Sequence, residues 1–172
     1  LARTALPLLT PGDVLDIASG DGVLAELLAP HAHRYVCVDA SQRVVAAAAE
    51  RLRRYANVEV REGDMHALPF KDASFDLVVL MHALTYAAKP AQAVAESARV
   101  LRKGGRMLLS SLARHEHRNV VEAYGHQNLG FSEKELRKFA EKAGLRIARC
   151  ETVTRERRPP HFEVISLIGE KP

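Results

Sequence analysis

The residues with the clearest chemical potential are glycines and acids near the start of the chain. Gly20, Gly22 and Ala25 fit the pattern G-x-G-x-x-A directly after an apolar run. Such a turn lets a ligand approach the backbone closely, and a following helix offers free N–H groups. Asp39 ends the next apolar run, 19 residues after Gly20, where a carboxylate can accept hydrogen bonds from two ribose hydroxyls. The glycines alone also fit a plain strand-to-helix turn, but together with Asp39 they predict a site for an adenosine-containing cofactor.

The charge of this loop favours one kind of adenosine cofactor. Asp16 ends the first apolar run and Asp21 lies between the glycines. Two carboxylates facing the pyrophosphate of NAD would repel it in a partly desolvated site. S-adenosylmethionine has no phosphate, and Asp16 can attract its ammonium group while loop N–H groups bind its carboxylate. The acidic loop therefore favours S-adenosylmethionine and disfavours NAD.

A further acid follows the third apolar run. Asp64 and Met65 lie just past it, at the edge of the sheet where open α/β folds bind their ligands. Asp64 can accept a hydrogen bond from the adenine amino group, and Met65 can pack on the ring face. Alone, each would be a turn aspartate or a core methionine. Their position relative to Asp16 and Asp39 favours the cofactor site.

The elements that must position these residues alternate between short apolar runs and helical stretches, which predicts an open α/β sheet. The strands are expected at 13–18, 34–39, 58–62, 75–81, 106–112, 146–153 and 161–169. The helices are expected at 23–30, 42–55, 91–102 and 132–144, with Ser41 capping the second and a Ser132–Glu135 capping box on the fourth. The last two strands are joined by a short link holding Pro159 and Pro160, which predicts an antiparallel edge hairpin. Residues 1–9 are typical of the end of a helix.

These segments together resemble the class I S-adenosylmethionine-dependent methyltransferases, in particular the small-molecule branch that includes ubiquinone-type enzymes. The resemblance rests on VLDIASGDG (14–22), YVCVDAS (35–41), the stretch 62–87 and RVLRKGGRMLLSSL (99–112). It implies a Rossmann-like sheet of seven strands, order 3-2-1-4-5-7-6, with strand 7 antiparallel and helices on both faces. It also implies S-adenosylmethionine-dependent methyl transfer to an unidentified, small-molecule acceptor.

The resemblance also implies which residues bind the cofactor. Asp16, Ser19 and Gly20 would hold its methionine end. Asp39 and Ala40 would hold the ribose, and Asp64 and Met65 the adenine. Met81 would lie near the sulfonium. The sequence departs from the family motif at one point, because Ala18 stands where the family has its first glycine. A methyl group there could crowd the cofactor or shift the loop.

Residues that act on the acceptor are expected after the fourth and fifth strands. His82 and Tyr86 are the candidate catalytic residues, because they follow Met81 and histidine is a base near neutral pH. His115 and His117 could bind a metal with His126, but no carboxylate or cysteine stands at a companion spacing, so no metal is predicted. Surface histidines would give the same pattern, and the sequence does not single out the catalytic base. Asn119 and Tyr124 are further polar residues of this region.

Composition limits the remaining classes. The chain has 172 residues, a net charge of +4 and two well-separated cysteines. These values fit one cytoplasmic domain with reduced thiols, and no apolar run approaches the roughly 20 residues of a membrane span. The expected domain is 1–172, a single S-adenosylmethionine-binding unit that lacks N-terminal residues of a longer protein. Its charge balance does not predict nucleic-acid binding, and it leaves the oligomeric state open.

A second function stays open from the sequence. Residues 113–132 are the least typical stretch and stand where the family places a substrate cap. Similar segments occur in methyltransferase domains fused behind winged-helix regulators of the arsenic-repressor type. The alternative is therefore a domain that senses S-adenosylmethionine or S-adenosylhomocysteine for a fused DNA-binding domain.

Overall fold

The computed structural model describes residues 12–119, 123 and 125–172, so the expected helix end at 1–9 and Tyr124 lie outside the described residues. Within this part the strands are β1 (Asp13–Ile17), β2 (Arg34–Asp39), β3 (Val58–Glu62), β4 (Phe75–Met81), β5 (Leu101–Leu112), β6 (Arg146–Arg155) and β7 (Glu163–Glu170). The helices are α2 (Val23–Leu28), α3 (Gln42–Leu52), α4 (Pro90–Val100) and α6 (Glu133–Lys142), with the 3₁₀ turns η2 (Ala29–His31) and η3 (Ala83–Tyr86).

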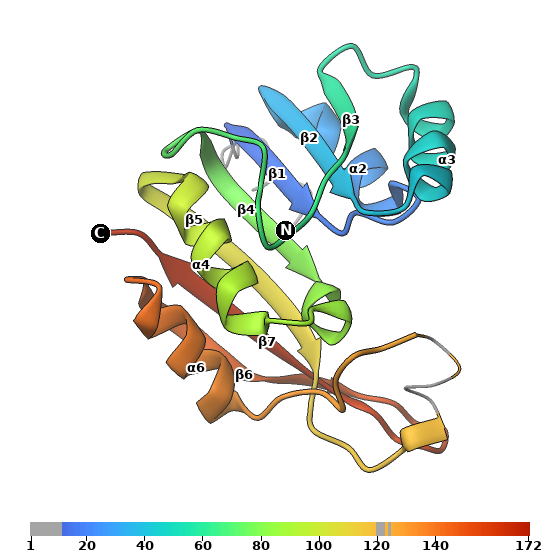
Figure 1. Ribbon diagram of the computed structural model, residues 1–172, viewed down its shortest axis with the longest axis vertical. Helices are drawn as coiled ribbons and strands as arrows, with labels where there is room; N and C mark the ends of the chain where they lie inside the picture. Colours follow the sequence, from blue (N-terminus) through green and yellow to red (C-terminus); the bar gives the residue numbers. More distant parts are fainter. Residues whose placement is uncertain (1–11, 120–122, 124) are drawn as a thin grey trace, which may run out of the picture.

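The strands form one seven-stranded sheet in the order β3-β2-β1-β4-β5-β7-β6, which confirms the predicted topology (Figure 1). β1 to β5 pair in parallel, and β7 runs antiparallel to both β5 and β6. Strands β1, β2 and β4 are continuous apolar runs because helices cover both faces of the sheet. The carboxyl ends of β1, β2 and β4 therefore meet at one edge of the sheet.

Two apolar layers hold the helices on the sheet. On one face, Ala25 of α2 and Leu52 of α3 are buried with Tyr35 and Cys37 of β2. The other face is covered by α4 and α6, which lie side by side in Figure 1. No helix of the described residues is long and apolar enough to cross a membrane.

Helix ends differ in part from the sequence expectation. The Ser132–Glu135 capping box is present, with the Ser132 hydroxyl accepting from the Glu135 N–H at 3.2 Å. Ser41 occupies the N-cap position of α3, but its side chain makes no cap hydrogen bond there. The Asp39 carboxylate accepts from the Ser41 N–H at 3.0 Å, which holds the main chain just ahead of the helix. The predicted cap position is therefore confirmed, and the predicted side-chain hydrogen bond is absent.

The largest boundary error lies between α4 and β5. Helix α4 ends at Val100, and β5 begins at Leu101, five residues before the predicted start at 106. The pairing with β4 skips from Leu101 to Arg106, and Gly104 has a left-handed φ of 79°. The register of β5 on β4 thus shifts near this glycine within one continuous strand, an irregularity that the apolar pattern does not reveal.

Candidate functional site

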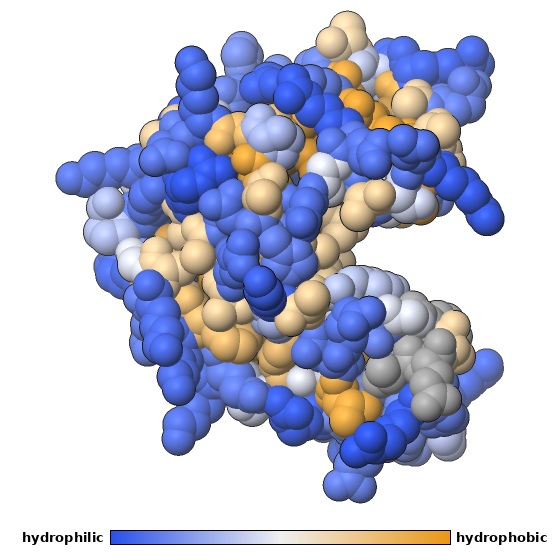
Figure 2. Space-filling model, viewed as in Figure 1, coloured by the Kyte–Doolittle hydropathy of each residue, from blue (hydrophilic) through white to orange (hydrophobic). Residues whose placement is uncertain are grey.

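A cavity of about 690 Å³ lies at the carboxyl edge of the sheet. It lies where Figure 2 shows a notch in the molecule, with pale apolar atoms on its inner walls. Of the ten residues that the sequence singled out for the cofactor or for catalysis, eight line this cavity: Gly20, Asp39, Ala40, Asp64, Met65, Met81, His82 and Tyr86. Asp16 and Ser19 do not line it.

Asp39 links the loop after β1 to the start of α3. One carboxylate oxygen accepts from the Gly20 N–H at 3.2 Å, and the other accepts from the Ser41 N–H at 3.0 Å. Each oxygen keeps a second lone pair, because a carboxylate can accept about four hydrogen bonds. The side chain lines the cavity, so it is fixed in place and still able to accept from a ligand's hydroxyl groups.

The loop before α2 adopts left-handed backbone at three positions. Gly22 is the N-cap of α2 with a φ of 84°, and a Cβ there would lie 2.7 Å from a methyl carbon of Leu52 on α3. Glycine at this position therefore serves helix packing as well as the turn. Ala18 has a φ of 54°, a conformation that favours glycine, and it lines the cavity. Alanine in place of the family's glycine at position 18 therefore strains the backbone beside the cavity.

Replacing Ala18 by glycine should stabilise the protein and improve ligand access. A left-handed alanine costs roughly 1–2 kcal/mol, and the greater freedom of glycine in the unfolded chain offsets about 0.4–1 kcal/mol. We expect Ala18→Gly to raise the free energy of unfolding by up to about 1 kcal/mol in urea titrations and to tighten S-adenosylmethionine binding. Ala73→Gly is the matched control, because Ala73 has a φ of 53° but does not line the cavity. Equal affinity changes in both variants would contradict the expectation.

Asp16 lies buried behind the loop and outside the cavity. It is 2% exposed, and one of its carboxylate oxygens accepts from the Tyr35 hydroxyl at 2.9 Å. Burial raises the pKa of Asp16 to about 7, although the Tyr35 hydrogen bond opposes the rise. A direct contact between Asp16 and a ligand ammonium stays a prediction.

Ser19 and Asp21 complete the loop in different ways. The Ser19 hydroxyl oxygen is buried outside the cavity, and its contact with the Cys37 thiol opposes the rise that burial causes in the pKa of that thiol. The Asp21 carboxylate pairs with the Arg51 guanidinium at 2.7 Å on the surface. Asp21 therefore does not supply negative charge to the cavity. Asp39 and Asp64 are the carboxylates that line the cavity, so the positions of Asp16 and Asp21 do not support the charge argument against a pyrophosphate.

Asp64 is organised by His66, a cavity residue that the sequence reasoning missed. An Asp64 carboxylate oxygen accepts from the His66 N–H at 2.8 Å and lies 2.7 Å from the His66 Nδ1. The main-chain hydrogen bond, followed by the side-chain one, lowers the pKa of Asp64. The Lys89 N–H donates to the His66 Nε2 at 3.2 Å, so the imidazole links the Asp64 loop to the start of α4.

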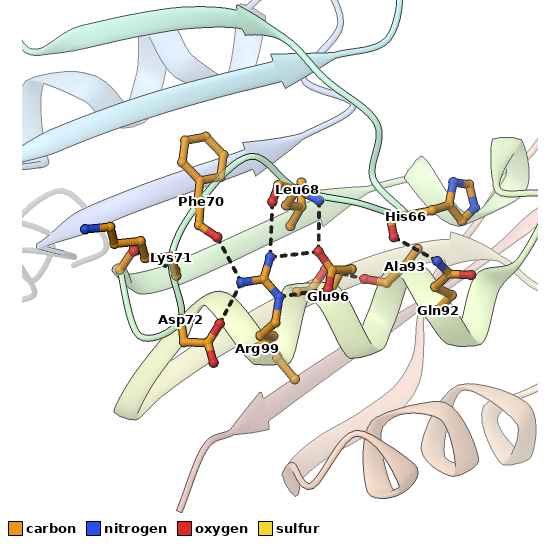
Figure 3. Close-up of polar contacts among 12 residues, drawn as sticks. His66, Leu68, Phe70, Lys71, Asp72, Gln92, Ala93, Glu96 and Arg99 are labelled. Atoms are coloured by element: carbon orange, nitrogen blue, oxygen red, sulfur yellow. Dashed lines mark hydrogen bonds and ion pairs between the residues drawn. The ribbon is translucent and has the colours of Figure 1, made fainter.

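The loop from 66 to 72 is held along α4 by side chains of that helix (Figure 3). The Arg99 guanidinium donates to the carbonyl oxygens of Leu68, at 3.1 Å, and Phe70, at 2.8 Å. The Gln92 amide donates to the His66 carbonyl at 2.9 Å. Glu96 pairs with Arg99 and accepts from the Leu68 N–H at 2.8 Å. Alternate carbonyls of an extended segment are thus satisfied by a helix, which fixes the segment that follows Asp64 and Met65.

Loss of this clamp should weaken both the fold and the side of the cavity that Asp64 and Met65 line. Arg99→Ala removes the donors to two carbonyls and the partner of Glu96, and each such hydrogen bond contributes about 1 kcal/mol. We expect a fall of about 2–3 kcal/mol in the free energy of unfolding and a weaker affinity for S-adenosylmethionine in calorimetry. Arg102→Ala is the control, because Arg102 pairs with Asp13 and Asp76 away from the cavity. If Arg102→Ala weakened the affinity as much as Arg99→Ala, the clamp would have no specific role.

Met81 at the end of β4, His82 before η3 and Tyr86 at the end of η3 also line the cavity. His82 has a left-handed φ of 57°, and its N–H donates to the Ser110 carbonyl at 2.9 Å, so backbone hydrogen bonding to β5 holds a strained residue. Burial lowers the pKa of His82, and the nearby His126 lowers it further. An imidazole in this environment is uncharged near neutral pH and can accept a proton.

The remaining histidines do not form a metal centre within the described residues. His115 and His117 stack against each other with ring centroids 5.7 Å apart, and both contact the Phe162 ring. His126 contacts Tyr86. No group of three or more histidine, cysteine or acidic side chains in the described part of the chain could hold a metal ion. Asn119 is exposed.

Comparison with known proteins identifies the family. The sequence profile described as "Methyltransferase domain" matches residues 15–109, more than half of the chain, from β1 into β5. The chain is a class I S-adenosylmethionine-dependent methyltransferase domain. The matched range holds every cavity residue named above, so the family match and the geometry point to the same edge of the sheet.

Curated relatives of the methyltransferase domain are also named as methyltransferases. It is 38% identical over 99 residues to the "Probable S-adenosylmethionine-dependent methyltransferase" of Mycolicibacterium smegmatis, a match covering 58% of this chain and 37% of the relative. It is 33% identical over 96 residues to the demethylmenaquinone methyltransferase of Clavibacter sepedonicus, covering 56% of this chain and 39% of the relative. The matches span less than half the length of these relatives.

Solved structures show the same fold over almost the whole methyltransferase domain. The N-methyltransferase NodS of Bradyrhizobium japonicum, solved with S-adenosyl-L-homocysteine, superposes with a TM-score of 0.76 at 20% identity. That match covers 99% of this chain and 86% of the other. The likeness extends beyond residue 109 to α6 and the β6–β7 hairpin, which the sequence profile does not reach.

Proposed function

We propose that this domain binds S-adenosylmethionine in the cavity at the carboxyl edge of the sheet and transfers its methyl group to a small-molecule acceptor. The observation that carries the proposal is Asp39, fixed by two main-chain N–H groups at the end of β2 and lining the cavity. Asp39 would hold the ribose with Ala40 beside it, and Asp64 and Met65 would bind the adenine. The names of the relatives support the same donor.

The residues present fit this cofactor. Bound S-adenosylmethionine supplies an electrophilic methyl group. The cavity offers the carboxylates of Asp39 and Asp64 to a cationic ligand, and neither lysine nor arginine lines it within the described residues. Ser19, Gly20 and Asp16 would serve its methionine end, Asp16 from behind the loop. Met81, half exposed at the end of β4, would lie near the sulfonium.

His82 and Tyr86 are the residues we assign to the acceptor side. They line the cavity beyond the end of β4, whereas Asp39 ends β2 and Asp64 follows β3. His82 would take the acceptor's proton on an imidazole nitrogen, because burial keeps that ring uncharged at neutral pH. Tyr86 would orient the acceptor through its hydroxyl group.

Direct binding measurements test the proposal. Calorimetric titration should show binding of S-adenosylmethionine and S-adenosylhomocysteine and none of NAD, because the family and the named relatives of this domain use S-adenosylmethionine. Binding of NAD alone would refute the assignment. Transfer of a labelled methyl group in an acceptor screen would establish catalysis. If both adenosyl ligands bind and no acceptor is methylated, a sensing domain that acts on a fused DNA-binding domain becomes the better explanation.

A further inference from the structure

The two ring nitrogens of His66 have different partners, one on each side of the ring. Nδ1 lies 2.7 Å from an Asp64 carboxylate oxygen, Oδ1, and Nε2 accepts from the Lys89 N–H at 3.2 Å. A main-chain N–H only donates, so Nε2 must offer a lone pair to Lys89. A neutral imidazole with a lone pair on Nε2 carries its proton on Nδ1, where it donates to Asp64. The start of α4 therefore fixes the tautomer of His66 that holds the Asp64 carboxylate.

His66 occupies one oxygen of Asp64 and leaves the other. The main-chain N–H of His66 and its ring Nδ1 both meet Oδ1, at 2.8 and 2.7 Å. Within residues 12–119, 123 and 125–172, no hydrogen bond reaches the second oxygen, Oδ2. The Asp64 side chain is 63% exposed, and both residues line the cavity. Two hydrogen bonds to Oδ1 hold the carboxylate against rotation, so Oδ2 is the oxygen that a ligand would meet.

The main chain around His66 is held by contacts that do not involve its ring (Figure 3). The Ala67 N–H donates to the Asp64 carbonyl at 3.1 Å, and the Gln92 amide donates to the His66 carbonyl at 2.9 Å. Further along, the Arg99 guanidinium donates to two carbonyls of the same loop. The loop is thus anchored without the imidazole, and the ring nitrogens serve the carboxylate.

We propose that His66 is a positioning residue that makes the cavity selective for the amino group of adenine, by holding Asp64 with Oδ2 directed at that group. This inference rests on the proposed function, which assigns the adenine to Asp64. The hydrogen bonds from His66 lower the pKa of Asp64, so the carboxylate stays ionised and can only accept. An amino group suits such an acceptor, and a carbonyl oxygen in the same place would leave both groups unpaired.

Two ligands that differ in the base test the selectivity without catalysis. Calorimetry at pH 7.5 would compare S-adenosylhomocysteine with S-inosylhomocysteine, which carries a carbonyl oxygen in place of the adenine amino group. We expect the unmodified domain to bind S-adenosylhomocysteine at least about tenfold more tightly, the value of one hydrogen bond to a charged group. Equal binding of the two ligands would overturn the proposal. Failure of S-adenosylhomocysteine to bind the unmodified domain would instead refute the proposed function itself.

Two amide variants separate positioning of Asp64 from support of the loop. His66→Asn keeps a donor near the place of Nδ1 and should retain most of the preference for S-adenosylhomocysteine. His66→Gln carries its amide near the place of Nε2, where it can still accept from the Lys89 N–H, and should reduce the preference at least about fivefold. His33→Ala is the control, because His33 is exposed and pairs with Asp13 outside the cavity.

The order of the two amide variants decides the role of the ring. A purely structural ring would be replaced at least as well by glutamine as by asparagine, so a preference that survives in His66→Gln would overturn the proposal. Nitrogen NMR of the unmodified, ligand-free domain tests the tautomer without any substitution. We expect Nδ1 to be protonated and Nε2 unprotonated at pH 7.5. The opposite tautomer would also overturn the proposal, because Nδ1 could then not donate to Asp64.

Discussion

Asp39→Ala is expected to weaken S-adenosylmethionine binding about 100-fold or more in calorimetry. The carboxylate is assigned to two ribose hydroxyls, and each hydrogen bond to a charged group contributes about 1.5–3 kcal/mol. Two such bonds give at least about 3 kcal/mol, and every 1.4 kcal/mol is tenfold in affinity. The loss also frees the Gly20 and Ser41 N–H groups that Asp39 holds in the ligand-free protein, which loosens the loop further.

Two further variants separate binding from folding. Asp39→Asn keeps one acceptor oxygen and should lose less affinity than Asp39→Ala. Asp21→Ala removes a carboxylate from the same loop that faces Arg51 on the surface, so it should leave the affinity near that of the unmodified domain. An Asp39→Ala protein that unfolds at the usual temperature and binds within threefold of the unmodified domain would contradict the ribose assignment.

Asp16 is expected to make the stability of the fold depend strongly on pH. Its folded pKa of about 7 lies well above the value near 3.9 of an unfolded aspartate. The folded protein therefore binds a proton that the unfolded chain has released, and the stability this provides is complete below about pH 4 and lost as the pH rises through 7. Each pH unit costs about 1.4 kcal/mol in this window, so the free energy of unfolding should fall by about 3 kcal/mol between pH 5 and 8 from this group.

Asp16→Asn should remove that fall. Urea titrations at pH 5 and pH 8 should show the variant gaining about 3 kcal/mol on the unmodified protein across the interval, because the amide has the same shape and does not ionise. Tyr35→Phe should have the opposite effect and steepen the fall, since the Tyr35 hydroxyl stabilises the charged form of Asp16. A constant difference between Asp16→Asn and the unmodified protein at both pH values would show that Asp16 does not titrate in this range.

The sheet edge and most of the cavity lining could be predicted because they depend on local patterns. Strands β2, β3 and β4 have the predicted bounds. β2 and β4 are buried parallel strands with nearly continuous apolar runs, and the edge strand β3 alternates apolar and charged residues at first. Asp39 and Asp64 follow directly from this, because an acid at the end of such a strand must lie at the carboxyl edge. Asp21 could not be placed in the same way, because its orientation depends on Arg51, 30 residues away on α3.

The roles of residues that act through long-range contacts could not be predicted from the sequence. Glu96 and Arg99 stand three apart on α4, which indicates a local ion pair and gives no sign of the loop carbonyls that Arg99 holds. His66 and His126 are single histidines whose position beside Asp64 and Tyr86 depends on how loops dock. The roles of these residues depend on partners distant along the chain. A single sequence carries no information on such pairs.

Residues 127 and 128 are attached to η3 through the backbone of that turn and of the residue after it. Their hydrogen bonds end on the carbonyls of Leu84, Thr85 and Ala87, which every residue type provides. Two of these bonds come from main-chain N–H groups and two from the Asn128 amide. A side chain of η3 that lines the cavity, such as Tyr86, can therefore change while these hydrogen bonds persist.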